Sequence, residues 1–170
     1  MKKFLFFLFV AVMSWSITSS CNSSSGLAKQ IEDSISVEPP RPKGQTDVIG
    51  LRCEPIPVVR IAIIGLGMRG PGAISRLVNI EGVEIKAICD LEPYNIDRAQ
   101  GILKRNNRPE ATPYTGEEGW KKLCERDDVD LVYVCTPWFL HTPMAVYAME
   151  KGKHVAVEVP IARTMDECWQ

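Results

Sequence analysis

The sequence has few histidines and little net charge. Its 170 residues include two histidines, His141 and His154, and none of the six cysteines forms a C-x-x-C pair. Zinc-ligand spacing is therefore absent, and we predict no metal site. The formal net charge is −1, so the charge balance gives no reason to expect nucleic acid as a partner.

Long apolar runs are also absent beyond the amino terminus. Residues 4–13 are ten apolar residues behind Lys2 and Lys3, which is too short for a membrane span and typical of a secretory signal. No Arg-Arg pair supports twin-arginine export. The sequence of residues 17–21 resembles a bacterial lipobox, although Thr18 stands where leucine is preferred, so Cys21 would be lipidated. Simple cleavage is the alternative.

The amino-terminal third is expected to lie outside the folded domain. We predict a signal peptide over residues 1–20 and a bacterial product that is exported, either periplasmic or anchored as a lipoprotein. Residues 21–57 are predicted to be a flexible linker, because they open on Asn-Ser-Ser-Ser-Gly and later carry five prolines. Such a composition buries too little apolar surface to offset the entropy of ordering.

A predicted strand and a glycine turn organise the remainder. Residues 58–64 are apolar except for Arg60, which predicts a strand buried on both faces. Residues 65–70 read GLGMRG and fit G-x-G-x-x-G. In that motif the first glycine (Gly65) permits the tight turn, the second (Gly67) lets backbone approach a pyrophosphate, and the third (Gly70) lets the helix pack closely. A purely structural glycine turn is the alternative.

An acidic residue stands at the spacing that this motif requires. Residues 83–89 predict a second strand, and Asp90 follows it, 20 residues after Gly70. The dinucleotide fingerprint has an acid at about this spacing, which binds the adenosine ribose hydroxyls. Strand, glycine turn, helix, strand and acid in this order predict a dinucleotide-binding domain. A role for Asp90 as a helix cap is the alternative.

Strand and helix patterns alternate over residues 58–170, which predicts an α/β class with a Rossmann-like, doubly wound parallel sheet of about five to six strands. Further strands are expected near 112–114, 131–135 and 154–157, and helices near 71–80, 93–106, 117–126 and 142–151. Thr142 is expected to cap the last of these helices. A capping box at residues 164–167 precedes only three more residues, so we expect the domain to be incomplete at its carboxyl end.

Two more strand ends carry candidate ligand contacts, because ligands of parallel sheets bind beyond the carboxyl ends of strands. These are Thr136 to His141 and Glu158 to Pro160. Other interpretations remain open. Trp138 and Phe139 would then be loop aromatics or pack on another domain, His141 would start a helix, and Glu158 would be a solvated strand end.

The motifs GLGMRG, ICD, TPWFLH and EVP together resemble the NAD-binding domain of the glucose–fructose oxidoreductase, inositol dehydrogenase and MocA (Gfo/Idh/MocA) family. GLGMRGPGA, WKKLCERDDVDLVYVCTPW, YAMEKGKHVAVEVP and TMDECW are most similar to glycoside hydrolase family 109. The resemblance implies NAD as cofactor, with Met68 and Arg69 at the pyrophosphate and Asp90 at the adenosine ribose. The residues that it places near the nicotinamide are Trp138, Phe139, Leu140, His141, Glu158 and Val159.

The resemblance also implies an activity for proteins of this kind. Family 109 enzymes cleave glycosides, typically α-N-acetylgalactosaminides, by transient oxidation at sugar C3 with NAD, elimination, hydration and re-reduction. Val159 stands where dehydrogenases of the wider family carry the lysine of Glu-Lys-Pro, which disfavours the alternative of an NAD-dependent sugar oxidoreductase. A methyltransferase is a further alternative, which is disfavoured because it would lack the TPWFLH and EVP motifs.

The acid–base residues of the family belong to a carboxyl-terminal domain that these 170 residues lack, so no catalytic residue is assigned. We therefore expect a glycoside substrate only together with such a domain and do not expect the chain to be active alone. An inert nucleotide-binding fragment is a further alternative. The only membrane contact expected is through the lipid anchor, and a homo-oligomer is possible in principle.

Overall fold

The computed structural model describes residues 42–45 and 49–170 of a chain that divides into two units, residues 1–45 and 46–170. In the first unit the described residues form a turn, in which the Gln45 N–H donates to the Pro42 carbonyl at 3.4 Å. The predicted signal, Cys21 and much of the predicted linker lie outside the described residues. Within residues 42–45 and 49–170, no helix combines the length and the apolar character needed to cross a membrane.

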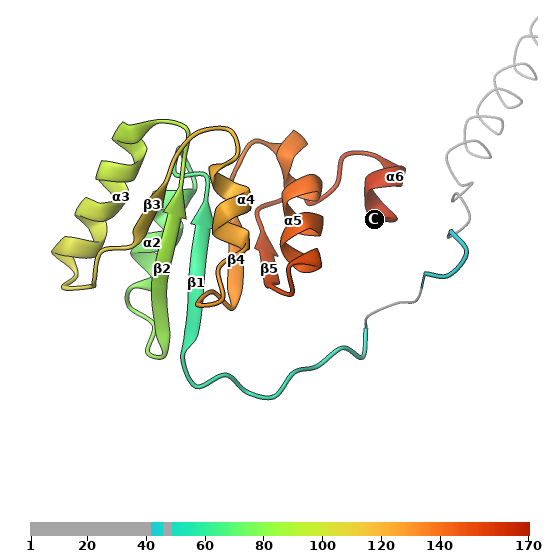
Figure 1. Ribbon diagram of the computed structural model, residues 1–170, viewed down its shortest axis with the longest axis horizontal. Helices are drawn as coiled ribbons and strands as arrows, with labels where there is room; N and C mark the ends of the chain where they lie inside the picture. The colour runs from blue at the N-terminus through green and yellow to red at the C-terminus, as the bar shows by residue number, and fades with distance from the viewer. Residues whose placement is uncertain (1–41, 46–48) are drawn as a thin grey trace, which may run out of the picture. The chain divides into compact units, whose positions relative to one another are not determined.

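Five parallel strands form a single sheet in the order β3-β2-β1-β4-β5 (Figure 1). The strands are β1 (Val59–Ile64), β2 (Val83–Cys89), β3 (Thr112–Tyr114), β4 (Leu131–Val134) and β5 (His154–Val157). The chain runs outward from β1 to β3 and then crosses to β4, so the topological switch point lies between the carboxyl ends of β1 and β4. The predicted doubly wound parallel sheet is confirmed.

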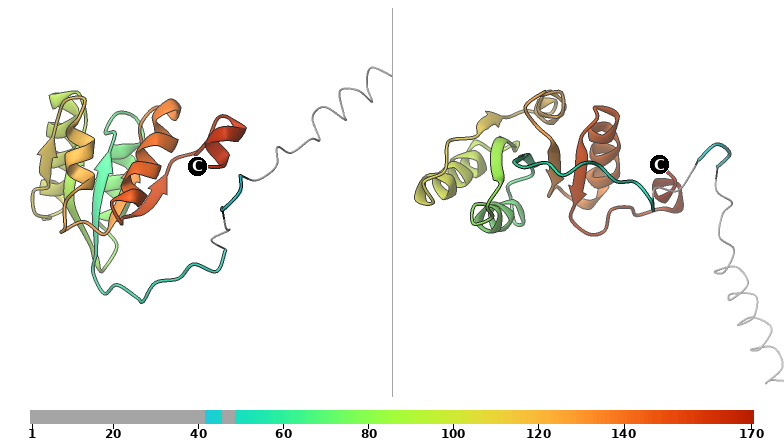
Figure 2. Two further views of the ribbon diagram at one scale, coloured as in Figure 1. Left: turned by 45° about the vertical axis from the view of Figure 1, so that its right-hand side comes forward. Right: turned by 90° about the horizontal axis from the view of Figure 1, so that it is seen from below.

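Helices cover both faces of this sheet, as Figures 1 and 2 show. One face carries α2 (Gly70–Leu77) and α3 (Pro93–Arg105), and the other carries α4 (Gly119–Cys124) and α5 (His141–Glu150). A 3-10 helix, η1 (Trp138–Leu140), precedes α5, and α6 (Met165–Cys168) follows β5. The crossover helices therefore leave the carboxyl edge of the sheet open between β1 and β4.

Alternate residues of β1 feed two hydrophobic clusters, one on each face. Ile61 and Ile63 pack with α2 and α3, while Ala62 and Ile64 pack with α4 and α5. All four are at most 4% exposed, so the predicted burial of this strand on both faces is confirmed. Continuous apolar sequence is what a central parallel strand requires, since neither face meets water.

Arg60, which interrupts the apolar run, ties the start of β1 to the residue before β4. Its guanidinium donates to both carboxylate oxygens of Asp130, at 2.9 and 2.5 Å, and its backbone N–H donates to the same carboxylate at 2.9 Å. The hydrogen bonds from Arg60 lower the pKa of Asp130 to about 2. A charge inside this strand is tolerated because a bidentate partner satisfies it.

Several predicted helix ends were wrong by a few residues. Thr142 does not cap α5, because its hydroxyl donates to the Ile161 carbonyl at 2.7 Å and the preceding 3-10 turn already leads into a helix that begins at His141. Residues 138–141 form that 3-10 turn and the first residue of α5. The capping box was correct at Thr164, whose side chain accepts from the Glu167 N–H.

Candidate functional site

The glycine turn after β1 is built at the switch point. Gly65 has a φ of +90°, and a Cβ there would lie 2.7 Å from the carbonyl carbon of Cys135 in the segment after β4. Backbone bonds hold the turn from both sides, since the Gly65 N–H donates to the Cys89 carbonyl and the Cys135 N–H donates to the Ile64 carbonyl. The first glycine is thus required by backbone conformation and by a close approach of two strand ends.

The other two glycines of the motif differ in what surrounds them. A Cβ on Gly70 would lie 2.2 Å from the Gly65 carbonyl oxygen, so this glycine lets the start of α2 pack onto the turn. A Cβ on Gly67 would meet no atom of the described chain within 4 Å. The fold itself therefore does not require glycine at 67. Open space beside this backbone is what an approaching ligand would need.

Asp90 lies beside the turn, at the carboxyl end of β2. One carboxylate oxygen accepts the Leu66 N–H at 2.6 Å, and the other accepts the Glu92 N–H at 2.9 Å and the Asn95 side-chain amide at 3.0 Å. The N-cap residue of α3 is Glu92, so Asp90 is not that helix's cap. These bonds fix the orientation of a carboxylate that still lines the cavity described below.

The segment after β4 supplies polar and aromatic side chains. The Thr136 hydroxyl is buried and has no hydrogen-bond partner among the described residues. Trp138 and Phe139 follow in the 3-10 helix, and both are more than half exposed. Buried polar groups are normally paired. An unpaired buried hydroxyl in the same segment as two exposed aromatic rings therefore indicates a ligand-binding surface.

His141 is fully buried at the start of α5. Its Nδ1 contacts the Pro160 carbonyl oxygen and its Nε2 contacts the Thr136 carbonyl oxygen, both at 2.7 Å. Together with the hydroxyl of Thr142, which binds the Ile161 carbonyl, it fastens the segment after β5 to the segment after β4. His141 therefore shapes the site, and its ring is held between two backbone acceptors.

Glu158 is held at the end of β5 by a neighbouring strand. The Tyr133 hydroxyl of β4 donates to the Glu158 carboxylate at 2.7 Å. Burial and this hydrogen bond raise the pKa of Tyr133 to about 12, so the phenol stays protonated and keeps donating. Val159, the next residue along the chain, is 81% exposed.

Two thiols lie near these strand ends, Cys89 in β2 and Cys135 after β4. Both are buried. Burial raises the pKa of each thiol to about 12. They remain protonated at neutral pH and supply no nucleophile to the site.

A cavity of about 510 Å³ joins these elements across the switch point. Nine of the twelve residues predicted for the site line it: Gly65, Gly67, Met68, Arg69, Asp90, Trp138, His141, Glu158 and Val159. Phe139 and Leu140 line an adjacent, mainly apolar cavity of about 460 Å³, which shares Gly65 and Asp90 with the first. Gly70 lines neither cavity, because it is buried against the turn.

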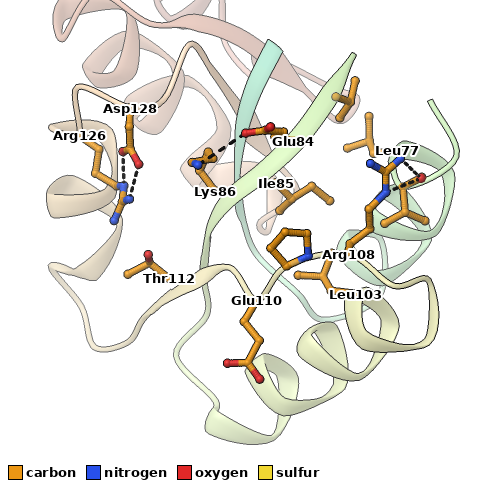
Figure 3. A pocket seen from close by; sticks show the side chains of 13 residues that line it. Leu77, Glu84, Ile85, Lys86, Leu103, Arg108, Glu110, Thr112, Arg126 and Asp128 are labelled. Carbon is orange, nitrogen blue, oxygen red and sulfur yellow. Dashed lines mark hydrogen bonds and ion pairs between the residues drawn. The ribbon is translucent and has the colours of Figure 1, made fainter. Parts of the chain in front are cut away.

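A third cavity, of about 380 Å³, lies away from this edge and is shown in Figure 3. It opens beside the amino-terminal half of β2, at residues 83–86. Its charged side chains are largely satisfied within the chain: Arg126 binds Asp128, Lys86 lies 3.6 Å from Glu84, and Arg108 donates to the Val78 carbonyl. It lacks free charged groups that converge on a common point, so we do not assign a site there.

The residues at the carboxyl edge fit a dinucleotide in three respects. There is open space at Gly67, where backbone must approach a pyrophosphate. The Asp90 carboxylate lies beside the turn, where an adenosine ribose would bind. The buried Thr136 hydroxyl has no partner among the described residues. The fold and this edge together define a dinucleotide-binding Rossmann domain.

Comparison with known proteins specifies the family. Residues 59–170 match the model of the Gfo/Idh/MocA family, described as an oxidoreductase family with an NAD-binding Rossmann fold, and the chain belongs to this family. The myo-inositol dehydrogenase from Lactobacillus casei, solved with NAD(H) and myo-inositol, is similar in structure, with a TM-score of 0.55 and 26% identity. That match covers 65% of this chain and 31% of the other. The predicted family and the NAD-binding fold are confirmed.

Sequence relatives bear names from glycoside hydrolase family 109. An α-N-acetylgalactosaminidase from Bacteroides fragilis is 56% identical over 126 residues, which is 74% of this chain and 30% of that protein. Glycosyl hydrolase family 109 protein 1 from the same species is 53% identical over 148 residues, 86% of this chain and 32% of that protein. The chain thus spans about 30% of the length of these relatives.

Some residues of the site were missed from the sequence. Tyr133 donates to Glu158 there, and Arg98 donates to the carbonyls of the glycine turn. Thr136 lies in the predicted segment of ligand contacts, but its unpaired hydroxyl is seen only in the structure. Tyr133 and Arg98 lie inside a strand and a helix with no local pattern that sets them apart.

Proposed function

We propose that the chain binds NAD along the carboxyl edge of its sheet, across β1 and β4. The observation that carries this is the single cavity that joins the glycine turn, Asp90 and Glu158. The pyrophosphate would lie against the backbone of Gly67 and Met68, near the start of α2, whose free N–H groups favour an anion. The adjacent apolar cavity has the character that an adenine ring needs.

Asp90 would select NAD over NADP. Its carboxylate is held beside the turn, where one oxygen accepts two hydrogen bonds and the other accepts only the Leu66 N–H, which leaves one lone pair for a ribose hydroxyl. A 2′-phosphate at the same position would face this negative charge. Trp138, His141, Glu158 and Val159 line the far end of the cavity and would form the nicotinamide side.

We further propose that this chain supplies the NAD-binding part of a family 109 glycosidase. Identity of 53–56% to proteins with these names supports the assignment, as does Val159 in place of a lysine. NAD would supply reversible hydride transfer at a sugar carbon. The chain's own part is to bind and orient the cofactor, with Tyr133 fixing the Glu158 carboxylate at the nicotinamide side.

An activity assay separates this from a sugar oxidoreductase. The endogenous product is isolated with an antibody to residues 58–170, its mass is measured, and it is given p-nitrophenyl α-N-acetylgalactosaminide with and without added NAD. A glycosidase releases nitrophenol and accumulates no NADH. Accumulation of NADH with free sugars would instead identify an oxidoreductase. Binding of NAD without either activity would support the alternative that the chain is an inert nucleotide-binding fragment.

We propose export as well, with lipidation at Cys21. The support is the sequence alone: Lys2 and Lys3, the apolar run behind them, and the lipobox-like residues before Cys21. Metabolic labelling of the producing cells with an alkyne fatty acid should mark the wild-type product. The Cys21→Ser variant should stay unlabelled, and equal labelling of both would contradict lipidation at this residue.

A further inference from the structure

Arg98 of α3 binds the backbone of the glycine turn and is not among the residues that line the cavity of about 510 Å³. Its Nη2 donates to the carbonyl oxygens of both Leu66 and Gly67, which lie more than 30 positions away in the sequence. The guanidinium carbon lies 5.8 Å from the centre of the Tyr94 ring, one turn earlier on α3. One cation is thus shared by two successive peptide groups of the turn.

These two bonds set the direction of two backbone donors. The peptide bonds Leu66–Gly67 and Gly67–Met68 are trans, so each N–H points opposite to the carbonyl of the same peptide group. With both carbonyls turned toward Arg98, the N–H groups of Gly67 and Met68 point away from it. Neither N–H makes a hydrogen bond within the described part of the chain, and both residues line the cavity of about 510 Å³.

We propose that Arg98 is the positioning residue of the pyrophosphate site. It holds the two carbonyls so that the N–H groups of Gly67 and Met68 form a paired donor for an anion, and its charge lies directly behind that donor. This inference rests on the proposed binding of NAD at the turn. The rival explanation is that Arg98 merely fastens α3 to the turn and contributes to stability alone.

The two explanations predict different effects of an Arg98 substitution on the Gly67 and Met68 amide groups and on the affinity for NAD and ADP-ribose. Arg98→Met keeps the apolar stem and removes both donors, while Arg98→Lys keeps the charge and one donor at a time. Arg105→Met removes a cation from the exposed side of the same helix and is the matched control. All variants are made in the full chain and compared with wild type by thermal unfolding and by titration with NAD and with ADP-ribose.

We expect Arg98→Met to weaken the binding of NAD and of ADP-ribose equally, by about tenfold or more, because both carry the pyrophosphate. Arg98→Lys should restore part of this loss, and Arg105→Met should stay within about twofold of wild type. In ¹⁵N spectra, NAD should shift the Gly67 and Met68 amide resonances strongly in wild type and Arg105→Met, and only weakly in Arg98→Met.

Several results would overturn the proposal. Unchanged NAD affinity in Arg98→Met, with a lower unfolding temperature, would make Arg98 purely structural. Equal loss in Arg98→Lys and Arg98→Met would contradict a role for its charge. If Arg98→Met does not fold, the folded Arg98→Lys variant decides. An NAD affinity clearly below that of wild type, with weakened shifts of the Gly67 and Met68 amides, supports the proposal, and wild-type affinity with wild-type shifts contradicts it. Failure of wild type to bind NAD would instead refute the proposed function.

Discussion

The glycines at 67 and 70 should respond in opposite ways to the same substitution. Gly67→Val places its side chain where the described chain has no atom within 4 Å of the Cβ, and the φ of Gly67 lies outside the left-handed region. We expect its free energy of unfolding to stay within about 1 kcal/mol of wild type. Gly70→Val brings a Cβ to 2.2 Å from the Gly65 carbonyl oxygen, which only a backbone shift relieves. A loss of about 3 kcal/mol or more is expected there.

The substitution that affects stability less, Gly67→Val, should affect NAD binding strongly. The valine at 67 would occupy the space through which a phosphate reaches the Gly67 and Met68 N–H groups. Loss of two charge-assisted hydrogen bonds, each about 1.5–3 kcal/mol, corresponds to a weakening of NAD binding of about 100-fold or more. Gly67→Val should therefore be folded and deficient in binding, whereas Gly70→Val should be deficient in folding first.

The assay combines chemical denaturation followed by circular dichroism with calorimetric titration by NAD, both on the full chain. Wild-type NAD affinity in a folded Gly67→Val would refute the reasoning, because the ligand would then not approach this backbone. A Gly70→Val variant as stable as wild type would show that the close contact with Gly65 does not constrain the turn.

Three further predictions concern single side chains. Asp90→Asn keeps an acceptor for the turn but removes the charge, so the preference for NAD over NADP should fall by about tenfold in competition titrations; an unchanged preference would exclude Asp90 as its source. Asp130→Asn should reduce stability by about 1–2 kcal/mol at pH 7. Because the Asp130 pKa is lowered from 3.8 to about 2, this contribution is present above pH 3.8 and is lost as the pH falls toward 2. The free energies of unfolding of wild type and Asp130→Asn should therefore differ at neutral pH and become equal near pH 2. His141→Leu removes a fully buried ring that contacts the carbonyl oxygens of Pro160 and Thr136, and should destabilise the fold by about 1–3 kcal/mol in urea, whereas wild-type stability would show that water replaces the ring.

The parts of the fold that follow from local pattern were predictable. The apolar run before Gly65, the three glycines and Asp90 each have a local physical reason at their spacing. The structure confirms the tight turn at Gly65 and the close packing at Gly70, while the ligand contacts of Gly67 and Asp90 stay predictions. Burial on both faces of β1 followed from its unbroken apolar residues. The order of the strands was not predicted, because the crossover rules for parallel strands limit the possible orders without fixing one.

What escaped prediction depends on contacts between distant segments. Arg98 meets the glycine turn, and Tyr133 meets Glu158, through side chains that carry no distinguishing pattern in the sequence. Thr142 was expected to cap α5, but the Ile161 carbonyl, brought close by β5, takes its hydroxyl instead. Such choices are made by tertiary geometry, which the spacing of residues along one helix does not encode.

The most direct test of the central claim is calorimetric titration of the full chain with NAD and with NADP. The account predicts one NAD bound per chain and an affinity for NADP that is weaker by about tenfold or more, because the 2′-phosphate of NADP would face Asp90. No binding of NAD would contradict the site itself. Equal binding of both cofactors would contradict the role of Asp90 within it.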